Sequence, residues 1–335
     1  SHYSLVRDGH RLVLPPEVNL WDAAALEAVH ATVAAEFGDG NHAAQSLLSV
    51  LQVAESLRDA PSVYLQQQRF DILRLFKRTL ERVLNRTEML PVYLTQLLEA
   101  VRKVQLVPGM ERALIGYRAA VVGWLPEFSG SAFMQFSGVL DRNVLVYLDM
   151  MDRGLAALEQ QPREGWESWE RVLNQFNRRG SFLGFDDQRV VHRLFEEWPL
   201  VAAQQALILG ALGVELHLAA AGAFPGALHA LSPQPLAEVP VDPYSHTAIQ
   251  YLQMQGGYTV FSVGPPAPKE QGPGRRTRSP NPGDVVIKVQ RLAPPPVPAV
   301  EEPPAATEAA GAETPVAAEL PAEAAAAEGP ADRRQ

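Results

Sequence analysis

The sequence predicts a mainly α-helical protein, in which a bundle of helical hairpins or an irregular α-solenoid is followed by a small α+β module and a disordered tail. Three observations lead to this prediction. Apolar residues recur at helical spacing through the first two thirds of the 335 residues. After residue 223, proline, glycine and alternating apolar residues replace that spacing. From residue 293 onward, Ala, Pro and Glu dominate, and so few large apolar side chains cannot offset the entropy of ordering.

Charge and composition argue against several classes of function. The formal net charge is -9, but the tail from Ala293 holds eight acidic residues and two arginines and so accounts for -6 of it. The remaining chain is close to neutral, which gives no electrostatic reason to expect nucleic-acid binding. The chain contains no cysteine, which excludes disulfides, thiolate metal sites and cysteine nucleophiles.

The N-terminal elements follow from turn and capping residues. Residues 1–18 are expected to form a hairpin and a linker, because two short apolar runs flank Asp8-Gly9, a turn-forming pair. Asn19 is expected to cap a helix that runs to Phe37, and Asn41 to cap the next one.

Proline then marks the start of three helices, because it costs no hydrogen bond in a first turn: Pro61, Pro91 and Pro108. A loop is expected over residues 125–139. Further helices are expected at 141–159, 166–177 and 186–221, the last with a break near Pro199. No fixed repeat period is evident, so an irregular bundle and a tetratricopeptide-type array remain alternatives.

The longest apolar run, residues 201–224, includes Gln204, Gln205, Glu215 and His217. Polar residues within the run favour a buried helix over a membrane span.

The C-terminal module is expected to be a helix packed on a three-stranded antiparallel sheet. Strands at 249–254 and 258–263 flank Gln255-Gly256-Gly257, which is typical of a hairpin, and residues 284–289 form a third strand. Asp242 before Pro243 predicts a rigid corner, since the carboxylate can bond its own turn while proline fixes φ. An apolar face is expected to pack on helix 206–218, formed by Tyr244, Tyr251 and Phe261.

The order of motifs from residue 205 to 289 resembles the C-terminal half of the major pseudopilins of type II secretion systems. In that family, a Gly-x-aromatic-Pro helix end precedes an Asp-Pro-aromatic turn, and Ser-x-Gly precedes a loop closed by an Asp-Ile strand. The residues that carry the resemblance here are Phe224, Pro225, Asp242, Pro243, Tyr244, Tyr251, Tyr258, Ser262, Gly264 and Asp284.

More of the chain resembles uncharacterised envelope proteins of planctomycete-like and verrucomicrobial bacteria, where this module follows a helical domain and an N-terminal membrane helix. The resemblance implies a helical-hairpin domain at 19–195, a pseudopilin-like module at 196–292 and a tail at 293–335. It also implies an interaction or scaffold protein on the periplasmic side of the inner membrane, anchored upstream of Ser1, with protein partners of unknown identity. The alternative is an accessory component of a type II secretion or type IV pilus-like machine.

Pseudopilins bind calcium in the loop after Ser-x-Gly, so the resemblance raises calcium as a cofactor. Calcium requires six to eight oxygen ligands, and residues 265–283 offer only Glu270, with Asp284 at the exit. Three arginines lie in the same loop, and they could contact anionic lipid or acidic protein or simply be solvated: Arg275, Arg276 and Arg278. We therefore expect no calcium and no other cofactor.

Candidate catalytic residues are few, and no enzymatic activity is expected. His192 and Glu196 at i, i+4 could supply two metal ligands, but no third follows, so a surface pair is the favoured interpretation. A hydrolase that uses His192 remains an alternative. Trp166 and Trp169 are expected in the core rather than in a binding stripe, and Asp186-Asp187 is expected to be a helix cap rather than a cation site.

Overall fold

The computed structural model describes residues 5–8, 11–13, 19–128, 138–178, 188–265 and 285–291. Residues 1–293 group into one compact unit. As the sequence predicts, this unit is mainly helical and carries a three-stranded antiparallel sheet. The tail from residue 293 and the loop with the three arginines lie outside the described residues.

The described part of the chain forms eight α-helices: α1 (Leu20–Glu36), α2 (Gly40–Ser56), α3 (Val63–Arg86), α4 (Pro91–Arg102), α5 (Val107–Phe128), α7 (Val139–Ala157), α8 (Pro162–Arg178) and α9 (Gln188–Ala221). A short 3-10 helix follows α9, η1 (Leu228–Leu231). The N-terminal strands pair antiparallel as predicted, β1 (Val6–Asp8) and β2 (Arg11–Val13). The main sheet has the order β3-β4-β5, with β3 (Gln250–Met254), β4 (Gly257–Ser262) and β5 (Val285–Gln290).

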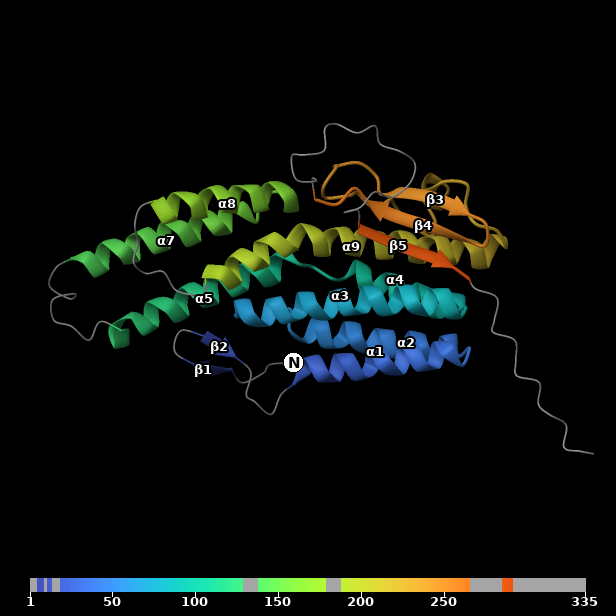
Figure 1. The fold of residues 1–335 in the computed structure, drawn as a ribbon, viewed down its shortest axis with the longest axis horizontal. Coiled ribbons are helices and arrows are strands. Elements are labelled where there is room, and N and C mark those ends of the chain that lie inside the picture. The colour runs from blue at the N-terminus through green and yellow to red at the C-terminus, as the bar shows by residue number, and fades with distance from the viewer. Residues whose placement is uncertain are drawn as a thin grey trace, which may run out of the picture. The chain divides into compact units, whose positions relative to one another are not determined.

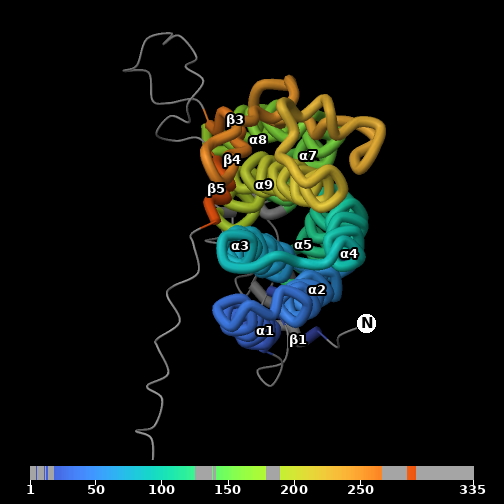
Figure 2. The backbone as a smooth tube through the Cα atoms, turned by 90° about the vertical axis from the view of Figure 1, so that its right-hand side faces the viewer, coloured from blue at the N-terminus to red at the C-terminus, as the bar shows by residue number. Residues whose placement is uncertain are grey.

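The helices stack in layers (Figure 1). Helices α1 and α2 form a hairpin that packs on α3, and α4 lies against α2. Helix α9 packs across α3 and α4, while α7 and α8 form a second hairpin that reaches α9 through α8. Viewed along the helices, α1 and α2 form the end layer, α3 and α4 the next, and α9 the third (Figure 2).

Two helix starts differ from the prediction. The cap of α2 is Asp39 rather than Asn41, and its carboxylate accepts a hydrogen bond from the His42 N–H at 2.9 Å. The helix begins two residues earlier than expected, so the Asn41 side chain is free to accept from Leu90 N–H at 3.3 Å. Pro61 precedes α3 instead of lying in its first turn, because the helix starts after Ser62.

One predicted break is wrong, and the start of a predicted loop is helical. Helix α9 is continuous through Pro199. Proline removes one backbone hydrogen bond from a helix, but the buried side chains of Trp198 and Val201 keep both sides of Pro199 packed in the core. Residues 125–128 belong to α5 rather than to a loop, and residues 129–137 of the expected loop lie outside the described residues.

The sheet packs on α9 with a face that differs in part from the prediction: Tyr251 pairs with Val260 and shares its face, as predicted, whereas Phe261 does not. Tyr258 and Val260 on β4 point toward α9, since the Tyr258 hydroxyl reaches the Ala211 carbonyl and Val260 approaches Gly210. Phe261 lies on the opposite face, because neighbouring residues of a strand alternate between faces. Every residue of β4 is buried, so alternation of apolar and polar residues could not reveal which face is inside.

Helix α3 covers the free edge of β5 with three side chains spaced four residues apart. The Lys77 ammonium donates to the Val286 carbonyl at 2.5 Å, and Glu81 accepts from the Lys288 N–H at 3.0 Å. Asn85 donates to the Lys288 carbonyl at 2.9 Å and accepts from the N–H of Gln290 at 2.7 Å. The edge groups of β5 are therefore paired with side chains instead of a fourth strand.

The expected boundary at residue 195 falls inside α9, which is continuous on both sides of it. The same helix contacts α3, α4 and α8 as well as β4 and β5. The helical part and the sheet therefore share one long element.

Two glycines seven residues apart on α5 provide a matched test of this packing. A Cβ on Gly116 would lie 2.1 Å from the Pro61 carbonyl oxygen, whereas a Cβ on Gly123 would meet nothing within 4 Å. We expect Gly116→Ala to lower the free energy of unfolding by about 1–3 kcal/mol. The control Gly123→Ala is expected to raise it by about 0.5–1 kcal/mol through helix propensity. Urea unfolding measures both, and an equal effect at the two positions would contradict the packing.

Candidate functional site

The Asp242 carboxylate is the centre of the predicted corner. It is buried, and each of its oxygens accepts two hydrogen bonds. Oδ1 accepts from Tyr244 N–H at 3.0 Å and from the Ser262 hydroxyl at 2.8 Å. Oδ2 accepts from Val263 N–H at 3.0 Å and from the Ser245 hydroxyl at 3.1 Å. One side chain thus ties the turn after η1 to the end of β4.

Neighbouring elements hold the corner in place. Pro243 and Tyr244 are buried, and the Arg163 guanidinium at the start of α8 donates to the Tyr244 carbonyl at 2.8 Å. Glu164 lies 3.1 Å from the His246 ring. Burial, followed by the charge of Asp242, raises the pKa of Tyr244. The phenol is therefore neutral at physiological pH.

The four donors leave Asp242 little capacity for chemistry. A general base needs a free lone pair within reach of a substrate proton, and a metal ligand needs one that faces the ion. Both carboxylate oxygens of Asp242 already serve turn and strand donors. The corner is built as a structural joint.

Three predicted aromatic residues meet over the end of α9. Phe224 packs edge-on against Tyr258 with ring centroids 5.5 Å apart, and Tyr251 lies 6.2 Å from Tyr258. Gly222, with φ of 70°, ends α9 and turns the chain back toward them. Burial raises the pKa of Tyr251 to about 12. The motif residues thus form the packing surface between the helix end and the sheet.

A buried ion pair lies beneath this aromatic group. The Glu215 carboxylate on α9 is 3% exposed, accepts from the Tyr258 hydroxyl at 2.9 Å and pairs with Arg291 at 2.6 Å. Arg291 follows β5 and also pairs with Glu88. Burial raises the pKa of Glu215, and the Arg291 charge and the Tyr258 hydrogen bond offset only part of that effect. The pair joins the end of the sheet to α9.

The structure thus brings most of the predicted motif residues together in two groups. Asp242, Tyr244, Ser262 and Gly264 form the corner, where the N–H of Gly264 donates to the Ser262 hydroxyl at 3.1 Å. Pro243 and Pro225 are buried beside the two groups. Outside the described residues lie Asp284, Arg275, Arg276 and Arg278.

Sequence reasoning missed the role of Glu215 and Arg291. The signal for Glu215 was a lone acidic residue within an apolar run, which implies a buried partner. Nothing local pointed to Arg291, because 76 residues separate it from Glu215.

The candidate metal pair does not assemble. The expected surface pair does not form either. Glu196 is exposed, whereas the His192 ring packs on Trp166 with centroids 4.9 Å apart and its Nδ1 is buried without a hydrogen-bond partner in the described part of the chain. Trp169 is fully buried and stacks on Phe195, so it belongs to the core as predicted. Among the described residues, no group of three His, Cys, Asp or Glu side chains is placed to hold a metal ion. Asp186 and Asp187 lie outside those residues.

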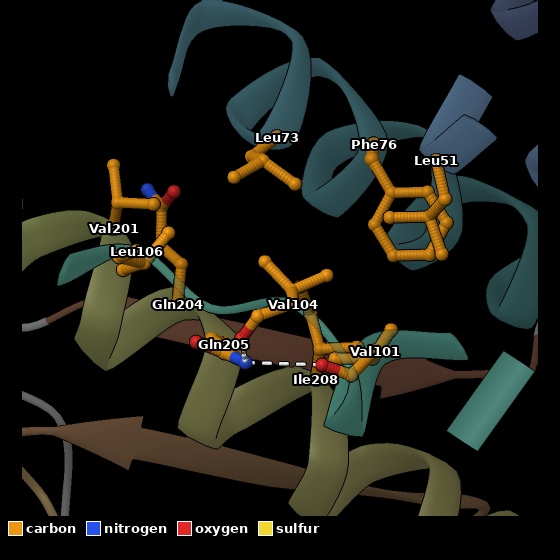
Figure 3. A pocket seen from close by; sticks show the side chains of 10 residues that line it. All are labelled: Leu51, Leu73, Phe76, Val101, Val104, Leu106, Val201, Gln204, Gln205 and Ile208. Atoms are coloured by element: carbon orange, nitrogen blue, oxygen red, sulfur yellow. Dashed lines mark hydrogen bonds between the residues drawn. The ribbon is translucent and has the colours of Figure 1, made fainter. Parts of the chain in front are cut away.

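A small cavity lies between α2, α3, α4 and α9 (Figure 3). Apolar side chains line it, together with Gln204 and Gln205. The Gln205 amide donates to the carbonyls of Val101 and Val104 at 3.0 and 2.9 Å, which completes the end of α4. The cavity measures about 20 Å³, on a scale where one water needs roughly 10–15 Å³. It has room for about one water, so we assign it no organic ligand.

Helix α9 is long and apolar enough, by length and composition alone, to cross a membrane. However, 67% of its most apolar window is buried inside the fold. A core helix passes the same test, and the contacts of α9 with three helices and two strands are those of a core helix.

Comparison of the chain with protein-family models, curated proteins and solved structures finds no match.

Replacing Asp242 tests the structural role of the corner. In Asp242→Asn, the amide NH2 replaces one carboxylate oxygen and so faces one backbone N–H and one serine hydroxyl. The hydroxyl can turn and accept from the NH2, but the buried backbone N–H loses its acceptor, and the charge that strengthened the other hydrogen bonds is removed. We expect the free energy of unfolding to fall by about 2–4 kcal/mol. The control Ser245→Ala removes one partly exposed donor and is expected to cost under about 1 kcal/mol. Urea unfolding of both variants measures the difference, and equal losses would contradict the central role of the carboxylate.

The Glu215–Arg291 pair predicts a pH dependence. Because the pKa of Glu215 is raised in the folded state, its contribution to stability is present below the unfolded pKa and lost as pH rises through the folded pKa. Arg291→Met removes the charge that lowers this pKa. The variant is therefore expected to lose little stability near about pH 4.5 and about 2–4 kcal/mol near about pH 8.

Urea unfolding across this pH range measures the effect. The double variant Arg291→Met/Glu215→Gln is the control, since it has no ionisable group at position 215, and its stability relative to the parent should depend less on pH. A loss in Arg291→Met that is the same at both pH values would contradict the assignment.

Proposed function

We propose that this chain is a non-enzymatic interaction or scaffold protein of the bacterial cell envelope. The observation that carries the proposal is how the two carboxylates that are buried in the described part of the chain are bonded. Both oxygens of Asp242 and both oxygens of Glu215 are bound by groups of the fold. Buried ionisable groups are usual candidates for catalysis, and here they act as joints between the helical layers and the sheet.

The envelope location and an upstream membrane anchor rest on the resemblance of residues 224–289. The gathering of Asp242, Tyr244, Ser262 and Gly264 into one corner is compatible with that resemblance. A rigid joint between a sheet and a helical stack suits a protein that presents surfaces to partners. The partners are therefore proposed to be proteins.

Fractionation of the bacterium that carries the complete gene tests this proposal. We expect the protein in the inner-membrane fraction and open to protease added to spheroplasts, and we expect chemical cross-linking to capture protein partners. The Ser245→Ala variant, which is expected to remain folded, should give the same result. Recovery in the cytosol, protected from added protease, would contradict the envelope location.

The alternative function, an accessory component of a secretion or pilus-like machine, makes a narrower claim. It is favoured if the cross-linked partners are pilin-like subunits or other parts of such a machine. Partners of other classes would favour a separate scaffold role.

A further inference from the structure

After its first turn, where Leu20 and Trp21 pack against the core, helix α1 carries its larger apolar residues on the outside. Its buried residues are all alanine: Ala24, Ala28, Ala31, Ala34 and Ala35. On the opposite face, Leu26, Val29 and Val33 are 56%, 56% and 46% exposed, and Phe37, the residue that caps the end of α1, is 86% exposed. Their spacing of three and four residues places them along one line of the helix. We refer to these four residues as the α1 stripe.

The position of the α1 stripe makes this exposure costly. Helices α1 and α2 form the end layer of the stack (Figure 2), and the end unit of a helical stack ordinarily has a polar outer face. The four side chains are 46–86% exposed and form one apolar patch on this end layer. A contiguous exposed apolar patch is often an interaction surface.

Charge argues against an anionic lipid surface as the occupant. Helix α1 contains no lysine or arginine, and its ionised side chains are acidic: Asp22, Glu27 and Glu36. Membrane-surface helices instead place basic residues beside their apolar face. The nearby arginines of α3, Arg82 and Arg86, are already paired with Glu36.

A second copy of the chain fits the stripe. The four side chains carry no charge, so a copy of the stripe placed on itself opposes apolar to apolar without burying an unpaired charge. Two stripes with their rims would bury roughly 1,000 Å², the lower limit for a specific interface. Contact between identical surfaces across a two-fold axis is the commonest symmetry of protein dimers.

We propose that two copies of this chain associate through the α1 stripe, α1 against α1, across a two-fold axis. The modest area predicts a weak dimer with a Kd on the order of 10–100 μM. The contact would join the end layers of two helical stacks. The inference concerns α1 alone and does not depend on the envelope location.

Sedimentation equilibrium over protein concentrations that span the expected Kd tests the proposal. The mass of the parent should rise from one chain toward two, and Val29→Glu/Val33→Glu should keep it at one. Leu145→Glu is the matched control, because Leu145 on α7 is an isolated apolar residue that is 67% exposed. The mass of Leu145→Glu should rise with protein concentration as the mass of the parent does. Circular dichroism should be unchanged in both variants, since the substituted positions face solvent.

A parent that stays monomeric, or a Glu pair that dimerises as the parent does, would overturn the proposal. An equal loss in Leu145→Glu would also overturn it. Vesicles of neutral and of anionic lipid form a separate arm. If the parent is monomeric and binds vesicles, and the Glu pair does not bind them, the occupant is a lipid surface and the proposal fails.

Cross-linking gives an independent measurement, because the chain has no native cysteine. Leu26→Cys and Phe37→Cys chains are mixed and oxidised. In an antiparallel pair centred between Val29 and Val33, Leu26→Cys should link to Phe37→Cys; in a parallel pair, each should link to its own kind. Either pattern supports the dimer and gives its direction. If disulfides between these chains form no faster than disulfides between Leu145→Cys chains, the dimer proposal is overturned.

Discussion

The fold depends on the burial of the middle of α9, where none of residues 201–215 is exposed. The helix packs against α3, α4 and α8, and strands β4 and β5 of the sheet pack against it. A helix enclosed in this way must be apolar around its whole circumference, which is why its composition also satisfies a membrane criterion. The same enclosure limits its polar residues: Gln205 satisfies carbonyls of α4, and Glu215 is satisfied by Tyr258 and Arg291. Gly210 and Gly213 leave the space that Ile249 and Leu236 fill.

The sheet is held from two directions by different forces. Its face rests on α9 through apolar contacts, and its β5 edge is bound to α3 through Lys77, Glu81 and Asn85. Four residues of a helix advance about 6.0 Å, and two residues of a strand advance about 6.7 Å. The three α3 side chains are therefore spaced closely enough to the outward-facing backbone groups of β5 for each to bond one or two of them. The Asn85 amide donates and accepts there as a peptide group of a neighbouring strand would. An edge covered in this way is closed to further strands.

The sequence was sufficient for features with local causes. Helical spacing located the helices, and Gln255-Gly256-Gly257 located the hairpin, because turn chemistry is contained within a few residues. The corner was only half predictable. Asp-Pro-Tyr indicated a turn, but two of the four donors to Asp242, Ser262 and Val263, come from residues about twenty positions away. The face of β4 could not be read, because burial on both sides removes the alternation that would identify it.

Helix α1 shows a further limit of pattern reading. Periodicity locates a face, and the usual rule places the face with the larger apolar residues inside. Close packing can reverse the rule, because the distance between helix axes depends on side-chain size and alanine allows the nearest approach. The inner face of α1 is made of alanine, so Leu26, Val29, Val33 and Phe37 are left outside. In the part of the chain that the structure describes, these four side chains stay exposed. The contact that we propose between two copies would bury them.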